Sequence, residues 1–541
     1  MAIHQILLIY ETSFLWRAIK NADREALELK PAKRLSVAVA TDLQDDSLHY
    51  GIVIDCGSSG SRVYVYYWPR HDPSSEDLLQ IKHVIDKDLK PVIKKVTPGI
   101  SSFGDKPAEA SDHLKPLLSY AASYVPQHKH KETPLYIMAT AGMRMLNEKQ
   151  QASILDDLRV DVPLEFQFLF HSNHVEVISG KQEGVFAWIA LNFALGKLDH
   201  SIGDDPLVAV ESSSKTGKLH VRKRTVGVLD MGGGSLQVAF EVPQFIKFQT
   251  REELPKSLMA EINLGCTTGD VKHTYRVYVT TYLGFGANAA RKTYEEAMFL
   301  KNKHLSTVFD PCLPVSMKQN ISGLLFIGSG KYEECYENVK ILINETAPCP
   351  KKPCAINGTF QPNIAFKNSE FYGFSEFYYT MEDVLRMGGR YLYSSFSRTA
   401  SDYCGTSYEV LSDLFKKNRY PKADENRLKF QCFKSAWVAA VLHNGLGFPK
   451  DYKSLTSLQS LGNQEIHWTL GALLFKTRFY PLRDKDSIGS ATKLSSVRSW
   501  LPLTTHAHYI IAGCVLIVGM SIVVYLRSIV PRRVEKNFSY A

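Results

Sequence analysis

Apolar and polar positions follow two patterns that alternate along most of the chain. Short runs of β-branched and aromatic residues bounded by turn residues are typical of buried strands. Such runs occur at 50–54, 63–68, 135–139, 226–229 and 238–241. Apolar residues at helical spacing predict helices at 105–127, 148–158, 430–447 and 468–475, and a strand, a turn and a helix within 175–196. Residues 197–222 are polar and predict a loop, and 305–365 have few periodic runs.

One strand–turn–strand unit occurs twice. The strand at 50–54 runs into DCGSSGSR, and the strand at 226–229 runs into DMGGGSLQ. The aspartates that open these turns, Asp55 and Asp230, are 230 − 55 = 175 residues apart. A two-fold recurrence of this kind predicts two similar lobes and not a solenoid.

An apolar segment near the C-terminus predicts a membrane span. Residues 509–526 contain no charged residue, and at about 1.5 Å per residue they reach roughly 27 Å, enough for a bilayer core. A buried core helix is the alternative. Arg527, Arg532 and Arg533 follow, so we expect a short cytoplasmic tail and a lumenal or extracellular main body. The apolar stretch 3–16 is short, includes a glutamate and is a poor signal peptide.

Composition, sequons and cysteines indicate a folded globular protein that faces an oxidising, glycosylating compartment. The 541 residues, 45% hydrophobic and 22% charged, fit more than one globular domain. The net charge of +9 is concentrated partly in the tail, and without a long Lys/Arg tract a nucleic-acid partner has no support. Asn320, Asn344 and Asn357 open glycosylation sequons. Six of the nine cysteines lie between 312 and 432, where disulfides would cross-link loops.

The two aspartate loops are candidates for binding phosphate and a metal ion. Glycine lets backbone N–H groups approach a phosphate closely, and Ser58, Ser59 and Ser235 add hydroxyl groups. Asp55 and Asp230 each end a strand, where a carboxylate can hold a hydrated Mg²⁺ or Ca²⁺. Two plain hairpin turns are the alternative, which the recurrence disfavours.

Three further segments carry candidate chemistry. Thr140, in ATAGMR, could contact a phosphate or orient a water, although the motif by itself favours a plain strand-to-helix turn. Glu183, in SGKQEG, stands where a turn enters a helix and could act as a general base; a first-turn glutamate favoured by the helix dipole is the alternative. The aromatic residues could stack on a base or pack in the core: Phe377, Tyr378, Tyr379 and Trp468.

Five segments taken in order resemble the conserved regions of the apyrase family, the ecto-nucleoside triphosphate diphosphohydrolases. They read DCGSSGSRV, ATAGMR, ISGKQEGVFAW, LDMGGGSLQ and WTLGALL. The stretches HKETPLYI and LKFQCFKSAW look like the intracellular branch with its Golgi and lysosomal UDPase-type enzymes. One departure is Leu236, where the family usually has threonine; we expect this side chain to face away from phosphate.

The resemblance implies an α/β, two-lobed actin-like (RNase H-like) fold with a cleft between the lobes, followed by a C-terminal transmembrane helix. The implied organisation is an N-terminal stalk 1–48, lobe I 49–180, lobe II 181–458, a return to lobe I 459–483, a linker 484–508, the span 509–526 and a tail 527–541.

The resemblance also implies roles. Glu183 would be the catalytic base and Tyr379 the base-stacking residue, and Asp55 and Asp230 would hold Ca²⁺ or Mg²⁺ through waters. The phosphate-binding residues would be Ser58, Ser59, Thr140, Gly232, Gly233, Ser235 and Gln237. The disulfides would be Cys312–Cys335, Cys349–Cys354 and Cys404–Cys432.

The implied activity is hydrolysis of nucleoside di- and triphosphates of the UDP, GDP and UTP class to the monophosphate, by direct attack of water. We expect a Golgi membrane location, with a lysosomal or other vesicle membrane as the alternative, and a role in clearing UDP or GDP after glycosylation. Two other readings use the same fold: an actin-like ATP-binding chaperone or kinase, and a non-catalytic membrane receptor. The sequons and the predicted span disfavour the first, and the intact polar motif residues disfavour the second.

Overall fold

The computed structural model describes residues 39–71, 78–199, 205–211, 219–242, 258–265, 273–461 and 464–478. Most of the predicted stalk, the apolar segment 509–526 and the tail after it lie outside the described residues. Within the described ranges, no helix combines the length and the apolar character that crossing a membrane requires.

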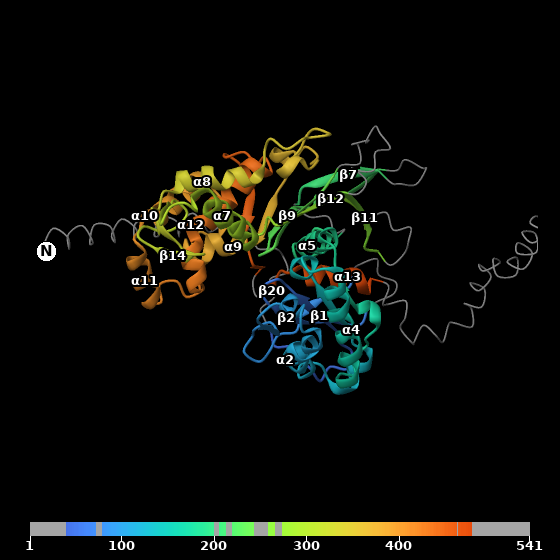
Figure 1. Ribbon diagram of the computed structural model, residues 1–541. Coiled ribbons are helices and arrows are strands. Elements are labelled where there is room, and N and C mark those ends of the chain that lie inside the picture. The colour runs from blue at the N-terminus through green and yellow to red at the C-terminus, as the bar shows by residue number, and fades with distance from the viewer. Residues whose placement is uncertain are drawn as a thin grey trace, which may run out of the picture. The chain divides into compact units, whose positions relative to one another are not determined.

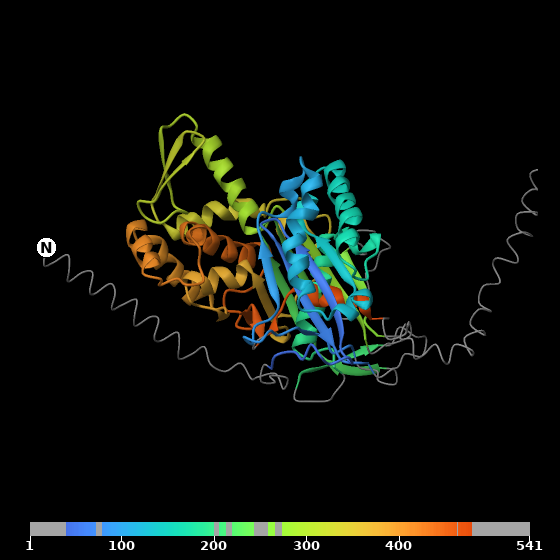
Figure 2. The ribbon, with the colours of Figure 1, turned by 90° about the horizontal axis from the view of Figure 1, so that it is seen from below.

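The first half of the chain builds a six-stranded sheet around the first aspartate loop (Figures 1 and 2). Its strands are β1 His49–Cys56, β2 Ser61–Trp68, β3 Lys82–His83, β4 Ile93–Val96, β5 Leu135–Ala139 and β6 Val175–Val177. The order is β3-β2-β1-β5-β6, with β4 also paired to β2. The helices α2 Ala110–Ala122 and α4 Glu148–Glu165 contact each other and this sheet, and their apolar side chains complete its core.

The second half builds a seven-stranded sheet with the order β11-β12-β10-β9-β16-β18-β17. Its strands are β9 Gly227–Met231, β10 Ser235–Glu241, β11 Met259–Asn263, β12 Thr274–Leu283, β16 Phe371–Ser375, β17 Gly389–Arg390 and β18 Leu455–Ser457. Helices gather beside it: α7 Ala287–Asn302, α8 Tyr332–Lys340, α10 Tyr393–Gly405, α11 Tyr408–Lys416 and α12 Glu425–Ala440. Their buried faces form one large apolar cluster with β9, β10 and β12.

The recurrence seen in the sequence is also a recurrence in strand pairing. β1 pairs antiparallel with β2 on one side and parallel with β5 on the other. In the same way, β9 pairs antiparallel with β10 and parallel with β16. Each aspartate therefore lies near the end of a central strand, just before a tight hairpin turn. The prediction of two similar lobes is confirmed at the level of topology.

Two helices lie side by side near both sheets (Figure 1). α5 Gly180–Ala194 contacts β9, β10 and β12, and α13 Trp468–Thr477 contacts β1. Their close packing depends on Gly471, where an added Cβ atom would come within 1.9 Å of the Phe186 carbonyl oxygen. The helix predicted near the end of the folded part thus returns to the first sheet.

One prediction about a loop is wrong, and a region for which no element was predicted holds a small sheet. Within 197–222, β7 Leu207–Glu211 and β8 Leu219–Lys223 form an antiparallel hairpin. In it the apolar Leu207 and Val221 are exposed and the charged Arg222 and Lys223 are buried, so the usual alternation does not mark it. Within 305–365, a three-stranded sheet precedes α8 and consists of β13 Thr307–Asp310, β14 Lys318–Ile321 and β15 Leu324–Gly328. These strands have only four or five residues each, too few to show a period.

The three implied disulfides are present. Cys312 bonds Cys335, Cys349 bonds Cys354 and Cys404 bonds Cys432. The last bond joins α10 to α12 inside the large apolar cluster. Cys56 is free and buried, whereas Cys266 and Cys514 lie outside the described residues. The sequon residues Asn320, Asn344 and Asn357 are all exposed.

Candidate active site

The first aspartate loop is a tight turn between β1 and β2. The Gly57 N–H donates to the Gly60 carbonyl oxygen at 3.0 Å. Two neighbouring turns pack against the backbone of Ser58: an added Cβ at Gly99 would lie 2.7 Å from its carbonyl oxygen, and one at Gly142 2.8 Å from its Cα. Glycine is needed at these close approaches, because any side chain would push the loop out of place.

The second loop is built in the same way and faces the first. The Gly232 N–H donates to the Ser235 carbonyl oxygen at 2.9 Å. Residues at the start of α7 donate backbone N–H groups to the Gly232 and Gly233 carbonyl oxygens at 3.0 Å. A Cβ at Gly233 would lie 3.1 Å from the Ser58 hydroxyl oxygen. The structure therefore brings together two loops that are far apart in the sequence.

Thr140 stands beside the first loop. It is the residue before the short helix α3 Ala141–Arg144, and its backbone N–H donates to the Cys56 carbonyl oxygen at 3.1 Å. Its side chain is buried. Leu236, by contrast, is fully buried in the apolar cluster of the second sheet, so it faces the core as expected.

Glu183 lies in the first turn of α5 and is only 8% exposed. Ser179 and Gln182 form a capping box that fixes where this helix begins. One oxygen of Glu183, Oε2, accepts hydrogen bonds from Arg144 Nη2 at 2.9 Å and from Gln237 Nε2 at 3.0 Å. The carboxylate is thus held in one orientation by Arg144, from the helix beside the first loop, and by Gln237, from the strand after the second loop.

Ser235 belongs to the same hydrogen-bond network. Its hydroxyl oxygen accepts from Arg144 Nη2 at 3.2 Å and from Gln237 Nε2 at 2.7 Å. Arg144 also donates to the Ile178 carbonyl oxygen at 3.0 Å. Arg144 was part of a sequence motif but was not assigned a role; the structure places it as the partner of Glu183.

Three carboxyl groups are buried in this region. Burial raises the pKa of Asp55 to about 8; the positive charge of Arg62 lowers this pKa, and the negative charges of Glu183 and Asp230 raise it. Burial also raises the pKa of Glu183 to about 7, where Arg144 lowers the pKa and Asp230 raises it. Burial also raises the pKa of Asp230, opposed by a hydrogen bond from Ser375. Concentrated negative charge of this kind is stabilised by a bound cation.

Asp55 and Asp230 fit a hydrated divalent cation. Oδ1 of Asp55 is buried and lacks a hydrogen-bond partner within the described part of the chain, and such an orphaned oxygen calls for a donor or a cation. Across the described ranges, no three His, Cys, Asp or Glu side chains are grouped closely enough to chelate a metal directly. A pair of carboxylates suits an ion that keeps several of its waters.

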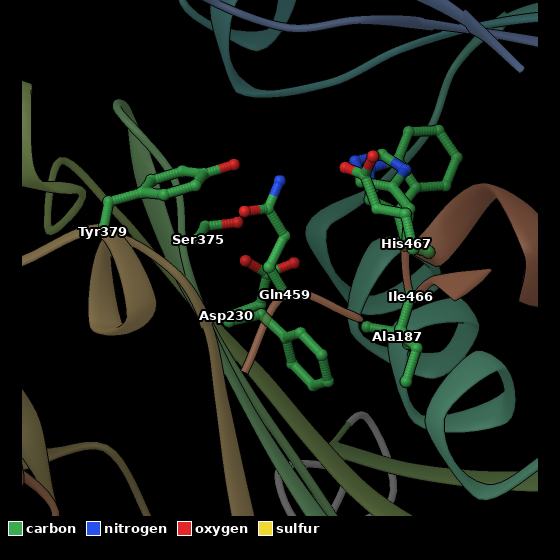
Figure 3. A pocket seen from close by; sticks show the side chains of 10 residues that line it. Ala187, Asp230, Ser375, Tyr379, Gln459, Ile466 and His467 are labelled. Carbon is green, nitrogen blue, oxygen red and sulfur yellow. The ribbon is translucent and has the colours of Figure 1, made fainter. Parts of the chain in front are cut away.

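A pocket of about 380 Å³ opens beside Asp230 (Figure 3). Asp230, Ser375 and Tyr379 lie on one side of it, and His467 lies on the other. The lining residues are Ala187, Asp230, Phe374, Ser375, Tyr379, Gln459, Glu465, Ile466, His467 and Trp468. They come from α5, from the C-terminal ends of β9 and β16, from the short helix that follows β16, and from the segment that leads into the first residue of α13.

Several pocket residues were not found from the sequence. Ser375 has φ 55°, a left-handed conformation that is uncommon for serine and that places it between β16 and the helix α9 Glu376–Tyr379. Burial raises the pKa of Glu465, and Arg62 opposes this rise; both residues also act on the pKa of Tyr379, which Arg62 lowers and Glu465 raises. Burial, and then Arg62 and His83, hold the pKa of His467 well below its usual value. Ser375, Glu465 and His467 lie outside the turns with a recognisable phosphate-binding pattern, whereas Arg62 ends the DCGSSGSR motif without having been assigned a role.

The aromatic candidates separate into two groups. Tyr379 and Trp468 line the pocket, whereas Phe377 is 2% exposed and belongs to the apolar cluster, so its packing role is the correct reading. The guanidinium of Arg427 lies 4.2 Å from the Tyr379 ring centroid and forms a 2.9 Å ion pair with Asp383. Tyr379 is therefore one wall of a polar, cationic niche.

Residues 41–493 match the family described as GDA1/CD39 (nucleoside phosphatase). Ectonucleoside triphosphate diphosphohydrolase 7 of Mus musculus is 49% identical over 90% of this chain and 82% of its own length. Ectonucleoside triphosphate diphosphohydrolase 4 of Mus musculus is 47% identical over 93% and 85%, and the nucleoside-diphosphatase mig-23 of Caenorhabditis briggsae is 38% identical over 85% and 83%.

A solved nucleoside triphosphate hydrolase from Neospora caninum has a similar fold. It superposes with a TM-score of 0.55 at 14% identity, covering 80% of this chain and 95% of that chain. At this identity the likeness concerns the fold alone, and it supports a two-lobed α/β arrangement for the described chain.

Proposed function

The chain belongs to the GDA1/CD39 (nucleoside phosphatase) family, and from this premise we propose that it removes the terminal phosphate of nucleoside di- and triphosphates of the UDP, GDP and UTP class. The products are the nucleoside monophosphate, reached in one or two steps, and inorganic phosphate. One observation carries the proposal: Glu183 is buried between two phosphate-type loops, and its carboxylate is held by Arg144 and Gln237.

The loops bind the phosphates. The backbone N–H group of Gly233 and the hydroxyls of Ser58, Ser59 and Thr140 supply donors without adding charge, while Gly232 shapes the turn through its own N–H bond to Ser235. The two loops approach each other so closely at Gly233 and Ser58 that one phosphate chain can contact both. Donors fixed by their own backbone need not reorganise when charge moves between phosphate oxygens, which favours the transition state.

Asp55 and Asp230 hold a divalent cation, Mg²⁺ or Ca²⁺, through water molecules. When bound, such an ion neutralises charge on the phosphate oxygens. The support is the charge of the buried carboxyl groups and the orphaned oxygen of Asp55. Their protons must leave before a cation binds, so cation binding is favoured at higher pH.

Glu183 takes a proton from the attacking water. The water oxygen forms a bond to the terminal phosphorus, the bridging P–O bond breaks, and the electron pair leaves with the shorter nucleotide. A buried base with a pKa near 7 is matched to this task at neutral pH. Arg144 and Gln237 hold Oε2 and keep the carboxylate aimed. No group on the protein becomes phosphorylated.

Tyr379 binds the base. Its ring lines the pocket, and Arg427 already lies against it at 4.2 Å. A nucleobase in this niche stacks on the Tyr379 ring and lies near the Arg427 guanidinium. Both contacts tolerate different bases. This fits a substrate range that includes UDP and GDP.

The reaction takes place in the lumen of the secretory pathway, at the Golgi membrane, where it clears the UDP or GDP left by glycosyl transfer. Three disulfides and three exposed sequon residues favour an oxidising, glycosylating compartment. The uncharged segment 509–526 with arginines after it supplies the membrane anchor.

A nucleotide panel tests the proposal. The full-length chain is incubated with UDP, GDP, UTP, ATP and UMP in the presence of Mg²⁺, Ca²⁺ or a chelator, and inorganic phosphate is measured. We expect release from di- and triphosphates with either cation, none from UMP and none in chelator. Transfer of phosphate to a sugar instead of to water, or tight nucleotide binding without turnover, would contradict the proposal.

A further inference from the structure

The two carboxylate oxygens of Asp55 have different surroundings. Oδ1 is buried without a hydrogen-bond partner in the described chain. Oδ2 lies 3.5 Å from Nε2 of His467, with the two side chains 12% and 14% exposed. This distance is at the outer limit of a hydrogen bond, and because little water screens the pair, an N–H group on Nε2 attracts the carboxylate. His467 thus contacts Oδ2 of Asp55 and leaves Oδ1 without a partner from the described chain.

The hydrogen of His467 is on the nitrogen that faces Asp55. His467 caps the N-terminus of α13, and its Nδ1 accepts the backbone N–H of Thr469 at 3.4 Å. A backbone N–H can only donate, so Nδ1 is the acceptor and Nε2 carries the hydrogen of the neutral ring. The helix start therefore selects the tautomer.

Two kinds of contact fix the orientation of the His467 ring, one with its face and one with its Nδ1 atom. The ring stacks on Tyr64 with centroids 4.6 Å apart and planes 18° apart. Nδ1 also lies 3.1 Å from the Thr469 hydroxyl, which in turn is 2.8 Å from the Tyr66 hydroxyl. Tyr64 and Tyr66 belong to β2, the hairpin partner of the strand that carries Asp55. The ring cannot turn without breaking several contacts.

The segment that carries His467 is anchored as well. The Ile466 N–H donates to the Gln459 carbonyl oxygen at 3.0 Å, and the Glu465 carbonyl oxygen contacts His83 Nε2 at 2.9 Å. This segment runs from the second sheet, after β18, to α13 beside the first sheet. It forms part of the pocket wall in Figure 3.

We propose that His467 is a positioning residue for Asp55: its Nε2–H holds Oδ2, so that Oδ1 is presented to the hydrated divalent cation. The inference rests on the proposed function, in which Asp55 helps to hold that cation. Carboxylates that bind metals are commonly oriented by a second hydrogen-bonding group, and loss of that group costs about 10- to 100-fold in metal affinity or activity.

The test compares two variants of the full-length chain. His467→Phe keeps a ring against Tyr64 but removes the N–H, whereas His467→Gln keeps a donor near the same place. His174→Phe is the matched control, because His174 packs on Tyr136 of the same sheet with ring centroids 4.4 Å apart. Binding of Mn²⁺ alone is measured by electron paramagnetic resonance without nucleotide, beside the Mg²⁺ dependence of phosphate release from UDP.

We expect His467→Phe to weaken Mn²⁺ binding by about tenfold or more and to raise the half-saturating Mg²⁺ concentration in parallel. His467→Gln should regain most of the affinity, and His174→Phe should bind as the wild type does. Equal Mn²⁺ affinity in folded His467→Phe and the wild type would overturn the inference.

A second variant keeps the test decisive if His467→Phe does not fold. Thr469→Val removes one of the two contacts at Nδ1, and we expect it to weaken Mn²⁺ binding, because the ring is then less firmly oriented; unchanged binding would count against the inference. Failure of the proposed function looks different: the wild type itself would release no phosphate from UDP, whatever its affinity for Mn²⁺.

Discussion

At the scale of residues, the site depends on carboxyl groups that the fold buries without full compensation. Asp55, Asp230 and Glu183 are each less than 10% exposed. Burial favours their protonated forms, and an arginine or a cation must restore the charged forms that chemistry needs. Arg144 does this for Glu183, which it contacts at 2.9 Å.

Removing the charge of Arg144 should move the pH dependence of the reaction. Arg144 lowers the pKa of Glu183, which burial raises to about 7. Arg144→Gln should therefore raise that pKa, so that the acidic limb of kcat/KM for UDP shifts to higher pH. Arg144→Lys keeps the charge and should shift it less. A pH–rate profile measures this shift. If the acidic limb of Arg144→Gln is the same as that of the wild type, Arg144 does not set the pKa of Glu183.

The site residues that the sequence predicted are those that belong to turns with recognisable chemistry. Asp55, Asp230 and Glu183 each follow a strand or open a helix, and the structure brings their regions together. His467 and Ser375 could not be predicted, because their importance comes from contacts with Asp55 and Asp230 that only strand register and chain return create. Ser375 in addition needs its unusual backbone angle of φ 55°.

At the scale of elements, the pair α5 and α13 connects Glu183, the proposed base, to Asp55, the proposed metal-binding aspartate. Glu183 lies in the first turn of α5, and His467 caps α13. Periodicity predicted both helices, with ends that differ from the structure by a few residues at most. It could not predict their closeness, which depends on the lack of a side chain at Gly471.

Filling the contact between α5 and α13 should destabilise the protein. A Cβ at Gly471 would lie 1.9 Å from the Phe186 carbonyl oxygen, so Gly471→Ala must separate the helices. We expect a loss of about 3 kcal/mol in the free energy of unfolding, the upper range for overpacking. Gly405→Ala is the control, since nothing lies within 4 Å of its added Cβ. Denaturant unfolding followed by circular dichroism compares them; equal stabilities would mean that the helices tolerate separation.

At the scale of the whole molecule, the two sheets carry the same strand–turn–strand unit and place its aspartates near one site. The recurrence was visible in the sequence because tight turns require glycine. The hairpin β7–β8 and the small sheet β13–β15–β14 were not visible, because strands of four or five residues are too short to establish a period. The predicted membrane span and lobe boundaries remain predictions.

Burial makes the charged forms of Asp55 and Glu183 unfavourable in the folded state, so a bound metal ion should affect stability in a pH-dependent way. The pKa of Asp55 rises from 3.8 to about 8 and that of Glu183 from 4.5 to about 7. The folded state therefore binds these protons more tightly, and the stability they contribute is full below about pH 4 and is lost as the pH rises toward 8. Mg²⁺ should consequently raise the unfolding temperature more at pH 8 than at pH 5.

Thermal unfolding of the full-length chain with Mg²⁺ or chelator measures this difference. Asp55→Asn should reduce the gain from Mg²⁺ at pH 8, whereas Asp105→Asn, at an exposed position, should not. An equal gain at both pH values would show that the buried carboxyl groups do not take up the cation.

The most direct measurement is the initial rate of phosphate release from UDP with Mg²⁺ for the wild type and Glu183→Gln. Glu148→Gln is the matched control, because Glu148 also lies in the first turn of a helix but is exposed. If Glu183 is the base, Glu183→Gln should lose about 10²- to 10⁴-fold in kcat while it still binds nucleotide, and Glu148→Gln should match the wild type. A Glu183→Gln rate within a fewfold of the wild type would contradict the account.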